Sequence, residues 1–85
     1  MSDLRQQFDR AVADSKSLAE RPDSATLLKL YALFKQAGSG DASGERPGIT
    51  DFVAQAKWDA WNGLQGISSE DAMKRYVDLV NELKG

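Results

Sequence analysis

The sequence contains no cysteine and no histidine. The first absence excludes disulfide bonds, thiolate metal sites and cysteine nucleophiles, and it fits a reducing compartment such as the cytoplasm. The second absence removes the commonest general base of enzymes and the commonest metal ligand. Carboxylates are plentiful, but none has a histidine or cysteine to activate. We therefore expect no catalytic residue, no metal site and no bound cofactor.

Long apolar runs and an excess of positive charge are also absent. The longest uninterrupted apolar run, residues 30–34, is far shorter than the ~20 residues that span a membrane, and neither end carries a readable targeting signal. With 11 Lys plus Arg against 13 Asp plus Glu, the net charge of −2 argues against a nucleic-acid partner. We expect a cytoplasmic monomer in which residues 1–85 form one domain.

Four stretches repeat apolar residues every three or four positions, which is the pattern of amphipathic α-helices. No stretch has the apolar–polar alternation of a half-buried β-strand. The expected helices cover residues 2–20, 24–37, 51–64 and 68–84. The sequence therefore predicts an all-α domain of four helices, in which short loops favour antiparallel neighbours.

Residues with capping side chains precede the expected helices. Ser2 and Thr50 are predicted to cap the first and third helices, and Asp23 or Ser24 is predicted to cap the second. The fourth helix has the clearest start, because Ser68 begins a capping box.

A long glycine-rich loop separates the second and third expected helices. Gly38 is predicted to end the second helix, and the irregular stretch runs to Gly48. Connections of this length in compact domains are usually functional or mobile. The loop lacks the GK[ST] ending of a phosphate-binding loop, and no strand precedes it. The sequence leaves open whether it is a flexible crossover or a functional segment.

The second expected helix is apolar over too wide an arc for an ordinary surface helix. Its apolar residues cover roughly 260° of the helical wheel, against the ~100° or somewhat more that packing on one core requires. One side must pack on the core, and another must be covered by something else. A partner helix would make the protein a helical interaction module. A ligand with an apolar part is the other candidate.

Two lysines lie inside apolar arcs. Lys35 projects between Tyr31 and Leu28 on the second helix, and Lys57 falls within the apolar arc of the third. Either ammonium alone can reach water along its own apolar stem. Together they favour a ligand that is anionic at one end and apolar at the other.

Four further side chains have a structural interpretation beside a functional one. Tyr76 lies in the core stripe of the fourth helix, where a buried hydroxyl needs a hydrogen-bond partner. Lys16 lies off the stripe of the first helix and has the position of a solvated surface charge. Trp58 and Trp61 are larger than a short structural helix requires. We expect one of them in the core and the other nearer a ligand.

The central stretch between Gly40 and Asn62 contains GD, ERPG, DF and AKWDAWN, and it resembles the acyl-CoA-binding protein family. Matching stretches outside it are LYALFKQA at 30–37 and SSEDAMKRYVDLVNELK at 68–84, so the resemblance covers nearly the whole chain. It implies an up-down-down-up four-helix bundle. It also implies an intracellular carrier that binds medium- and long-chain fatty acyl-CoA in a surface bowl, with no chemistry on the thioester.

The resemblance also implies a set of ligand contacts. The matching positions are Lys16, Leu27, Leu28, Tyr31, Phe34, Lys35, Lys57 and Tyr76. Lys35 and Lys57, with Tyr31, match residues that gather around the ribose 3'-phosphate of CoA. Leu27 and Leu28 match positions near the acyl chain. The remaining positions match further contacts of the ligand site, mostly with the head group.

Two positions depart from the family pattern. Phe34 stands where many members have tyrosine, which keeps a stacking face and loses a hydroxyl. Val53 stands where some members have lysine. We expect the first change to remove one polar head-group contact, and the second to lower the affinity for CoA itself.

Overall fold

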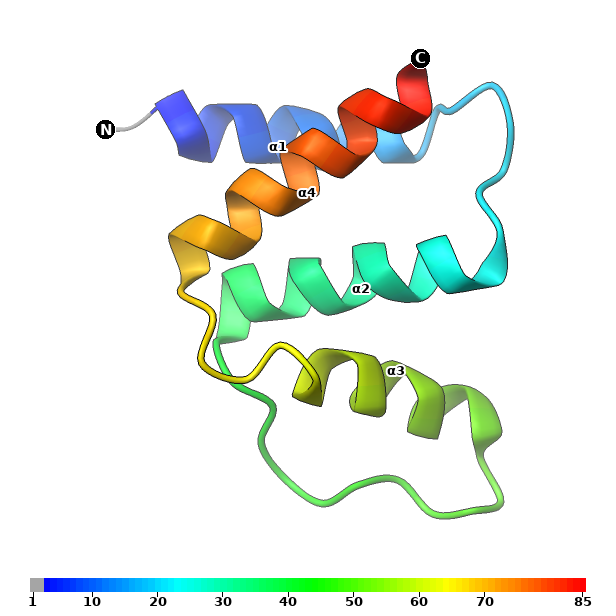
Figure 1. The fold of residues 1–85 in the computed structure, drawn as a ribbon. Coiled ribbons are helices and arrows are strands. Elements are labelled where there is room, and N and C mark those ends of the chain that lie inside the picture. Colours follow the sequence, from blue (N-terminus) through cyan, green and yellow to red (C-terminus); the bar gives the residue numbers. More distant parts are fainter. Residues whose placement is uncertain (1–2) are drawn as a thin grey trace.

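The computed structural model describes residues 3–85, which form four α-helices and no strand. The helices are α1 (Asp3–Ser15), α2 (Ser24–Ser39), α3 (Phe52–Asn62) and α4 (Ser69–Lys84). Helices α1 and α4 run in one direction and α2 and α3 in the other (Figure 1). The predicted all-α bundle with up-down-down-up topology is therefore confirmed.

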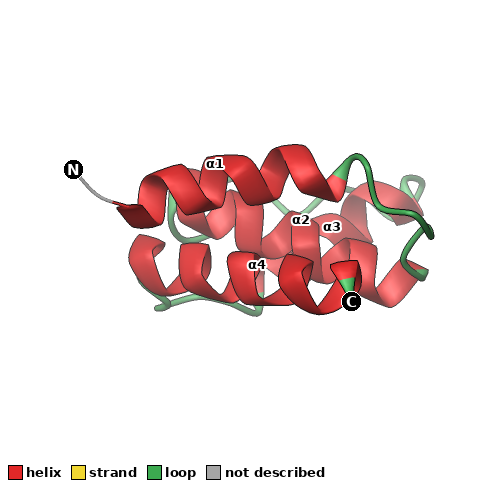
Figure 2. Cartoon of the chain, turned by 90° about the horizontal axis from the view of Figure 1, so that it is seen from above, coloured by secondary structure: helices red, strands yellow, loops and turns green. Residues whose placement is uncertain are grey.

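Helix α2 lies between α3 and α4, and α1 packs on α4 (Figures 1 and 2). The wide apolar arc of α2 is thus covered on two sides by helices of the same chain. The expectation that short loops join packed antiparallel neighbours is wrong in part. Helices α1 and α2 run antiparallel, as do α3 and α4, but the backbones of these consecutive helices do not lie side by side. Helix α1 meets α2 through side chains such as Phe8 and Phe34. Helices α2 and α3 run in the same direction, so the chain must return from the end of α2 to the level of its start before α3 begins. Loop 40–51 spans this distance.

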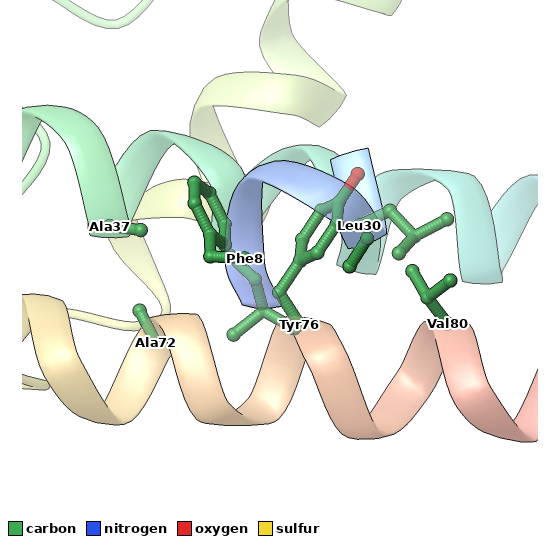
Figure 3. Close-up of a cluster of buried hydrophobic side chains, with 8 residues drawn as sticks. Phe8, Leu30, Ala37, Ala72, Tyr76 and Val80 are labelled. Atoms are coloured by element: carbon green, nitrogen blue, oxygen red, sulfur yellow. The ribbon is translucent and has the colours of Figure 1, made fainter. Parts of the chain in front are cut away.

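The main core lies where α1, α2 and α4 meet (Figure 3). The Phe8 ring meets the Tyr76 ring edge to face, with centroids 5.1 Å apart, and it stacks on Phe34 at 6.2 Å. Besides Phe8 and Tyr76, the buried members of this core are Ala11, Leu30, Leu33, Ala37, Ala72 and Val80. Helix α3 adds Trp61 as its one buried residue among those described. Most of the buried apolar surface therefore belongs to the other three helices.

Helix α1 ends at Ser15, earlier than the expected end near Glu20. The backbone N–H of Lys16 donates to the carbonyl of Ala13 at 3.2 Å, which closes the last turn with a three-residue spacing. Such a turn is tighter than an α-helical turn and does not continue the helix. The predicted cap Ser2 lies outside the described residues.

Two predicted ends in the centre of the chain need correction. Asp51 caps α3 in place of Thr50, because its Oδ1 accepts a hydrogen bond from the backbone N–H of Ala54 at 3.0 Å. A carboxylate here also faces the positive end of the helix. Helix α2 continues through Gly38 to Ser39 and is capped by Gly40, whose φ of 78° lies in the left-handed region that glycine adopts without strain.

The caps of α2 and α4 agree with prediction. An Asp23 carboxylate oxygen accepts from the backbone N–H of Thr26 at 2.8 Å, so Asp23 and not Ser24 is the cap. The Ser68 hydroxyl oxygen accepts from the backbone N–H of Asp71 at 3.1 Å. Each cap satisfies a backbone donor that the first helical turn leaves without a partner.

Candidate functional site

An open groove of about 280 Å³ lies between the end of α1, the first three turns of α2 and the middle of α4. We call it the α1–α2 groove. Its lining residues are Val12, Ser15, Lys16, Leu27, Leu30, Tyr31, Phe34 and Tyr76. Most of these side chains are apolar or aromatic, and Lys16 is the one ionised group among them. The groove therefore offers an apolar trough with a cation at its edge.

Three groove residues share one face of α2. Leu27, Tyr31 and Phe34 follow one another at helical spacings of four and three, so their side chains lie in a row. Phe34 is 45% exposed although it is a large apolar residue. The inner side of its ring stacks on Phe8, and the outer side has no cover from the described part of the chain. This row supplies apolar surface that an occupant of the groove can bury.

Tyr76 forms part of the groove wall and also belongs to the core. Only 4% of the residue is exposed, and its hydroxyl donates to Ser15 Oγ at 3.1 Å. Ser15 in turn donates to the carbonyl of Val12 at 2.7 Å. The buried hydroxyl thus finds its partner at the end of α1, as the structural interpretation of the sequence expected. A ligand in the groove meets a Tyr76 hydroxyl whose proton is already engaged.

Lys57 and Lys35 hold their ammonium groups over aromatic rings. Lys57 Nζ lies 5.3 Å from the centroid of the Tyr31 ring, and Lys35 Nζ lies 4.9 Å from that of Trp61. Both distances are in the range of cation–π contacts. Neither lysine lines the α1–α2 groove itself. Lys57 stands over a groove residue, and Lys35 follows Tyr31 by one turn on α2.

Three lysines beside the groove have no carboxylate partner within residues 3–85. The ion pairs of this part of the chain join Arg5 to Asp9, Arg46 to Asp59 and Lys84 to Asp14. Lys16, Lys35 and Lys57 belong to none of them. An ammonium without a carboxylate keeps its full attraction for an incoming anion. The site therefore combines apolar surface with three cations.

Leu28 and the two tryptophans lie away from the groove. Leu28 lines a separate hollow between α2 and α3 that also involves Ala60 and Leu64. Trp61 is 8% exposed and is the tryptophan of the core, whereas Trp58 is half-buried and its indole N–H donates to the carbonyl of Ser43 at 3.3 Å. The groove thus gathers five of the eight predicted residues, namely Lys16, Leu27, Tyr31, Phe34 and Tyr76.

Sequence reasoning missed three groove residues: Val12, Ser15 and Leu30. Val12 and Leu30 belong to apolar helical stripes, and such stripes predict burial in a core. Periodicity does not tell which members of a stripe the neighbouring helices leave uncovered. Ser15 was a small residue in the α1 stripe, and its contact with α4 depends on where α1 ends.

The loop before α3 is tied to that helix by an ion pair. Arg46 donates from Nε and Nη2 to the two carboxylate oxygens of Asp59, each at 2.8 Å. These hydrogen bonds lower the pKa of Asp59 and raise that of Arg46. Gln55 also donates to the carbonyl of Pro47 at 3.0 Å. The loop is therefore an anchored segment rather than a free crossover.

The described residues lack two other kinds of site. Within residues 3–85, no three or more acidic side chains are grouped so that they can hold a metal ion. In the same range, no helix has the length and apolar character needed to cross a membrane. The α1–α2 groove is the candidate functional site because it combines apolar surface with neighbouring ammonium groups.

The fold and the groove together define a small helical bundle with an open amphipathic site. A family model described as acyl-CoA binding protein matches residues 5–80. The chain belongs to the acyl-CoA-binding protein family.

Individual relatives agree with this assignment. The chain is 49% identical to acyl-CoA-binding protein homolog 1 of Caenorhabditis elegans over 76 residues, which are 89% of this chain and 88% of that protein. The crystal structure of Oryza sativa acyl-CoA-binding protein 2 superposes with a TM-score of 0.90 at 36% identity, covering 94% of this chain and 89% of that one.

One similar protein is a larger enzyme. The chain is 45% identical over 83 residues to enoyl-CoA delta isomerase 2 of Rattus norvegicus. The match covers 98% of this chain but 21% of the rat protein. The similarity thus concerns one part of that enzyme, and the family itself is named for binding.

Proposed function

We propose that the protein binds medium- and long-chain fatty acyl-CoA esters without changing them, and carries them in the cytoplasm as a monomer. The observation that carries this proposal is the apolar α1–α2 groove beside three lysines that have no carboxylate partner in residues 3–85. Membership of the family and the names of the relatives support the ligand class. An acyl-CoA has the two chemical ends that this arrangement suits.

The acyl chain is proposed to lie in the groove along Leu27, Leu30 and Phe34. Burying one methylene contributes about 0.8 kcal/mol, so ~10 methylenes contribute about 8 kcal/mol before the costs of ordering the chain. A hydrogen bond to a charged group contributes roughly 1.5–3 kcal/mol. The acyl chain should therefore contribute more to the affinity than any one of the lysines.

The phosphates of the head group are proposed to meet Lys16, Lys35 and Lys57. The Tyr31 ring lies under the Lys57 ammonium, so both can contact the same part of the head group. Tyr76 is proposed to contribute mainly its ring, because its hydroxyl proton is directed to Ser15. Leu28 lines the hollow between α2 and α3, and its predicted contact with the acyl chain stays a prediction. The lysines should set the orientation of the ligand and the preference for its head group.

The alternative of a helical interaction module rests on an uncovered apolar arc of α2. Helices α3 and α4 cover most of that arc, and Phe34 is the large apolar residue of α2 that stays exposed. An acyl chain in the groove is enough to bury the exposed side of Phe34, so no partner helix is needed. We also expect no release of thiol from acyl-CoA in the presence of the protein.

Isothermal titration with a long-chain acyl-CoA, free CoA and the matching free fatty acid tests the proposal. We expect the affinity to rise steeply from CoA to the acyl-CoA, because the chain fills the groove. The fatty acid should bind poorly, because it lacks the phosphates. Equal binding of fatty acid and acyl-CoA, or no binding of acyl-CoA, would refute the proposed function.

A further inference from the structure

Gln36 occupies an unusual place for a polar side chain. It is 0% exposed, and it is one of the two largest side chains that are fully buried. Its Nε2 donates to Asp41 Oδ1 and to the carbonyl of Ile67, each at 2.8 Å. A reversed amide would place its oxygen against both of these oxygens, so the two acceptors fix its orientation. Buried amides are retained where such hydrogen bonds hold them.

Asp41 completes a junction between three segments. The Oδ1 atom that accepts from Gln36 also accepts from the backbone N–H of Gly66 at 2.8 Å. The end of α2, the start of loop 40–51 and the turn between α3 and α4 thereby meet at one carboxylate oxygen. The hydrogen bond from Gly66, followed by that from Gln36, lowers the pKa of Asp41. We call this set of contacts the Gln36–Asp41 junction.

Gly40 connects the Gln36–Asp41 junction to Trp61 by hydrogen bonds. The backbone N–H of Gly40 donates to the carbonyl of Gln36 at 3.1 Å, and the carbonyl of Gly40 accepts from the indole N–H of Trp61 at 2.7 Å. The indole ring is buried, and the ammonium of Lys35 lies 4.9 Å from its centroid. A continuous series of short contacts therefore connects the junction to a cation of the candidate site.

We propose that the Gln36–Asp41 junction is a positioning device for Lys35, which keeps the Trp61 ring where it orients the ammonium toward the ligand head group. This inference rests on the proposed function, because it gives Lys35 an anionic ligand to meet. Gln36 and Asp41 touch no ligand in this scheme and act through Gly40 and Trp61. A contact that served only stability would change the binding of phosphorylated and unphosphorylated ligands alike.

A double-mutant cycle on Asp41 and Lys35 tests the proposal. For each protein, the affinity for a long-chain acyl-CoA is divided by the affinity for the matching acyl-pantetheine, which lacks the phosphates together with the adenosine. Asp41→Ala should lower this ratio about fivefold, and Lys35→Ala should lower it at least as much. The double variant should lose no more than Lys35→Ala alone, because Asp41 acts through Lys35. An unchanged ratio in Asp41→Ala, or additive losses in the double variant, would overturn the proposal.

Three controls separate positioning from general loosening. Asp41→Asn keeps an oxygen that accepts from Gln36 and Gly66, so its ratio should stay within about twofold of the wild type. Arg46→Ala breaks a different anchor of the same loop, the ion pair with Asp59, and should leave the ratio unchanged. Trp61→Phe keeps a ring for Lys35 but removes the N–H that Gly40 accepts, so its ratio should fall like that of Asp41→Ala. A loss in Arg46→Ala equal to that in Asp41→Ala would contradict a specific role of the junction.

The outcome also distinguishes the two proposals. Wild-type protein that fails to bind acyl-CoA would overturn both the proposed function and the positioning role. Wild-type protein that prefers acyl-CoA to acyl-pantetheine, with no change in Asp41→Ala and Trp61→Phe, would overturn the positioning role alone.

Discussion

Two regions of the molecule are held together by different forces. Helices α1, α2 and α4 meet around buried apolar side chains such as Phe8, Leu30 and Val80. Helix α3 packs on α2 and buries one side chain, Trp61, and loop 40–51 is joined to α3 by polar contacts, including the Arg46–Asp59 ion pair. Apolar burial scales with area and has no directional requirement, whereas a hydrogen bond fixes the relative position of two groups. The first region should therefore determine stability, and the second, through Trp61 and the Gln36–Asp41 junction, should determine how the Lys35 ammonium is oriented.

The largest expected effect comes from the apolar region. Phe8→Ala should reduce the free energy of unfolding by about 3–5 kcal/mol, because it leaves a cavity beside Phe34 and Tyr76. The matched control is Phe52→Ala at the start of α3, where the residue is 74% exposed; it should change stability by about 0.5 kcal/mol or less. Urea unfolding of both variants checks this. Similar losses in the two variants would remove the contrast between the regions.

The next effect concerns binding and separates it from stability. Lys57→Ala should weaken acyl-CoA binding by about 1.5–3 kcal/mol, because one charged contact to the head group is lost. Its melting temperature should stay close to that of the wild type, since the residue is exposed. Lys29→Ala, in the hollow formed with Arg75 and Glu82, is the matched control and should bind normally. If the melting temperature of Lys57→Ala fell as far as that of the core variant Leu30→Ala, the support for a ligand role of Lys57 would be lost.

A smaller effect tests the hydroxyl that joins α4 to α1. Tyr76→Phe should cost roughly 0.5–1.5 kcal/mol of stability, because it removes the hydrogen bond to Ser15 but keeps the ring contact with Phe8. In Tyr31→Phe the lost hydroxyl has no hydrogen bond to the described residues, so stability should change by at most about 0.5 kcal/mol. Equal losses in the two variants, measured by thermal unfolding, would show that the Ser15 contact contributes nothing.

The smallest effect is a local response to acid. Hydrogen bonds lower the pKa of Asp41 and of Asp59 below the ordinary carboxyl value of 3.8. Their stabilising contribution is therefore present above that value and is lost as the pH falls through the lower folded-state pKa. The indole N–H signal of Trp61 and the amide signal of Gly66 should shift in this range while Phe8 keeps its native environment. If the signals of Trp61, Gly66 and Phe8 changed together, the contacts around α3 would not be lost independently of the main core.

Much of the fold was predictable because its signals are local. The caps Asp23 and Ser68 act within their own first turns, and apolar spacing identifies each helix before any contact is known. The wide apolar arc of α2 predicted a cover on more than one side, and α3 with α4 supplies it. The family resemblance added the direction of each helix, which periodicity alone does not give.

The errors arise where distant segments decide the local structure. The apolar spacing of α1 continues past Ser15, but the helix stops there, next to a hydroxyl from α4. Leu27 and Leu28 are neighbours in sequence and both apolar, yet they face different hollows because α3 covers only one of them. The sequence around Gln36 gives no sign that this polar side chain is buried, because its burial depends on acceptors in loop 40–51 and before α4.

Acyl-CoA is proposed to occupy the α1–α2 groove with its head group at the neighbouring lysines. A titration of isotopically labelled protein with a long-chain acyl-CoA, followed by amide chemical shifts, tests it most directly. We predict the largest shifts at Lys16, Leu27, Tyr31 and Lys57. Shifts centred on Lys29, Leu64 and Glu82, which line a different hollow, or no shifts at all, would contradict this placement of the ligand.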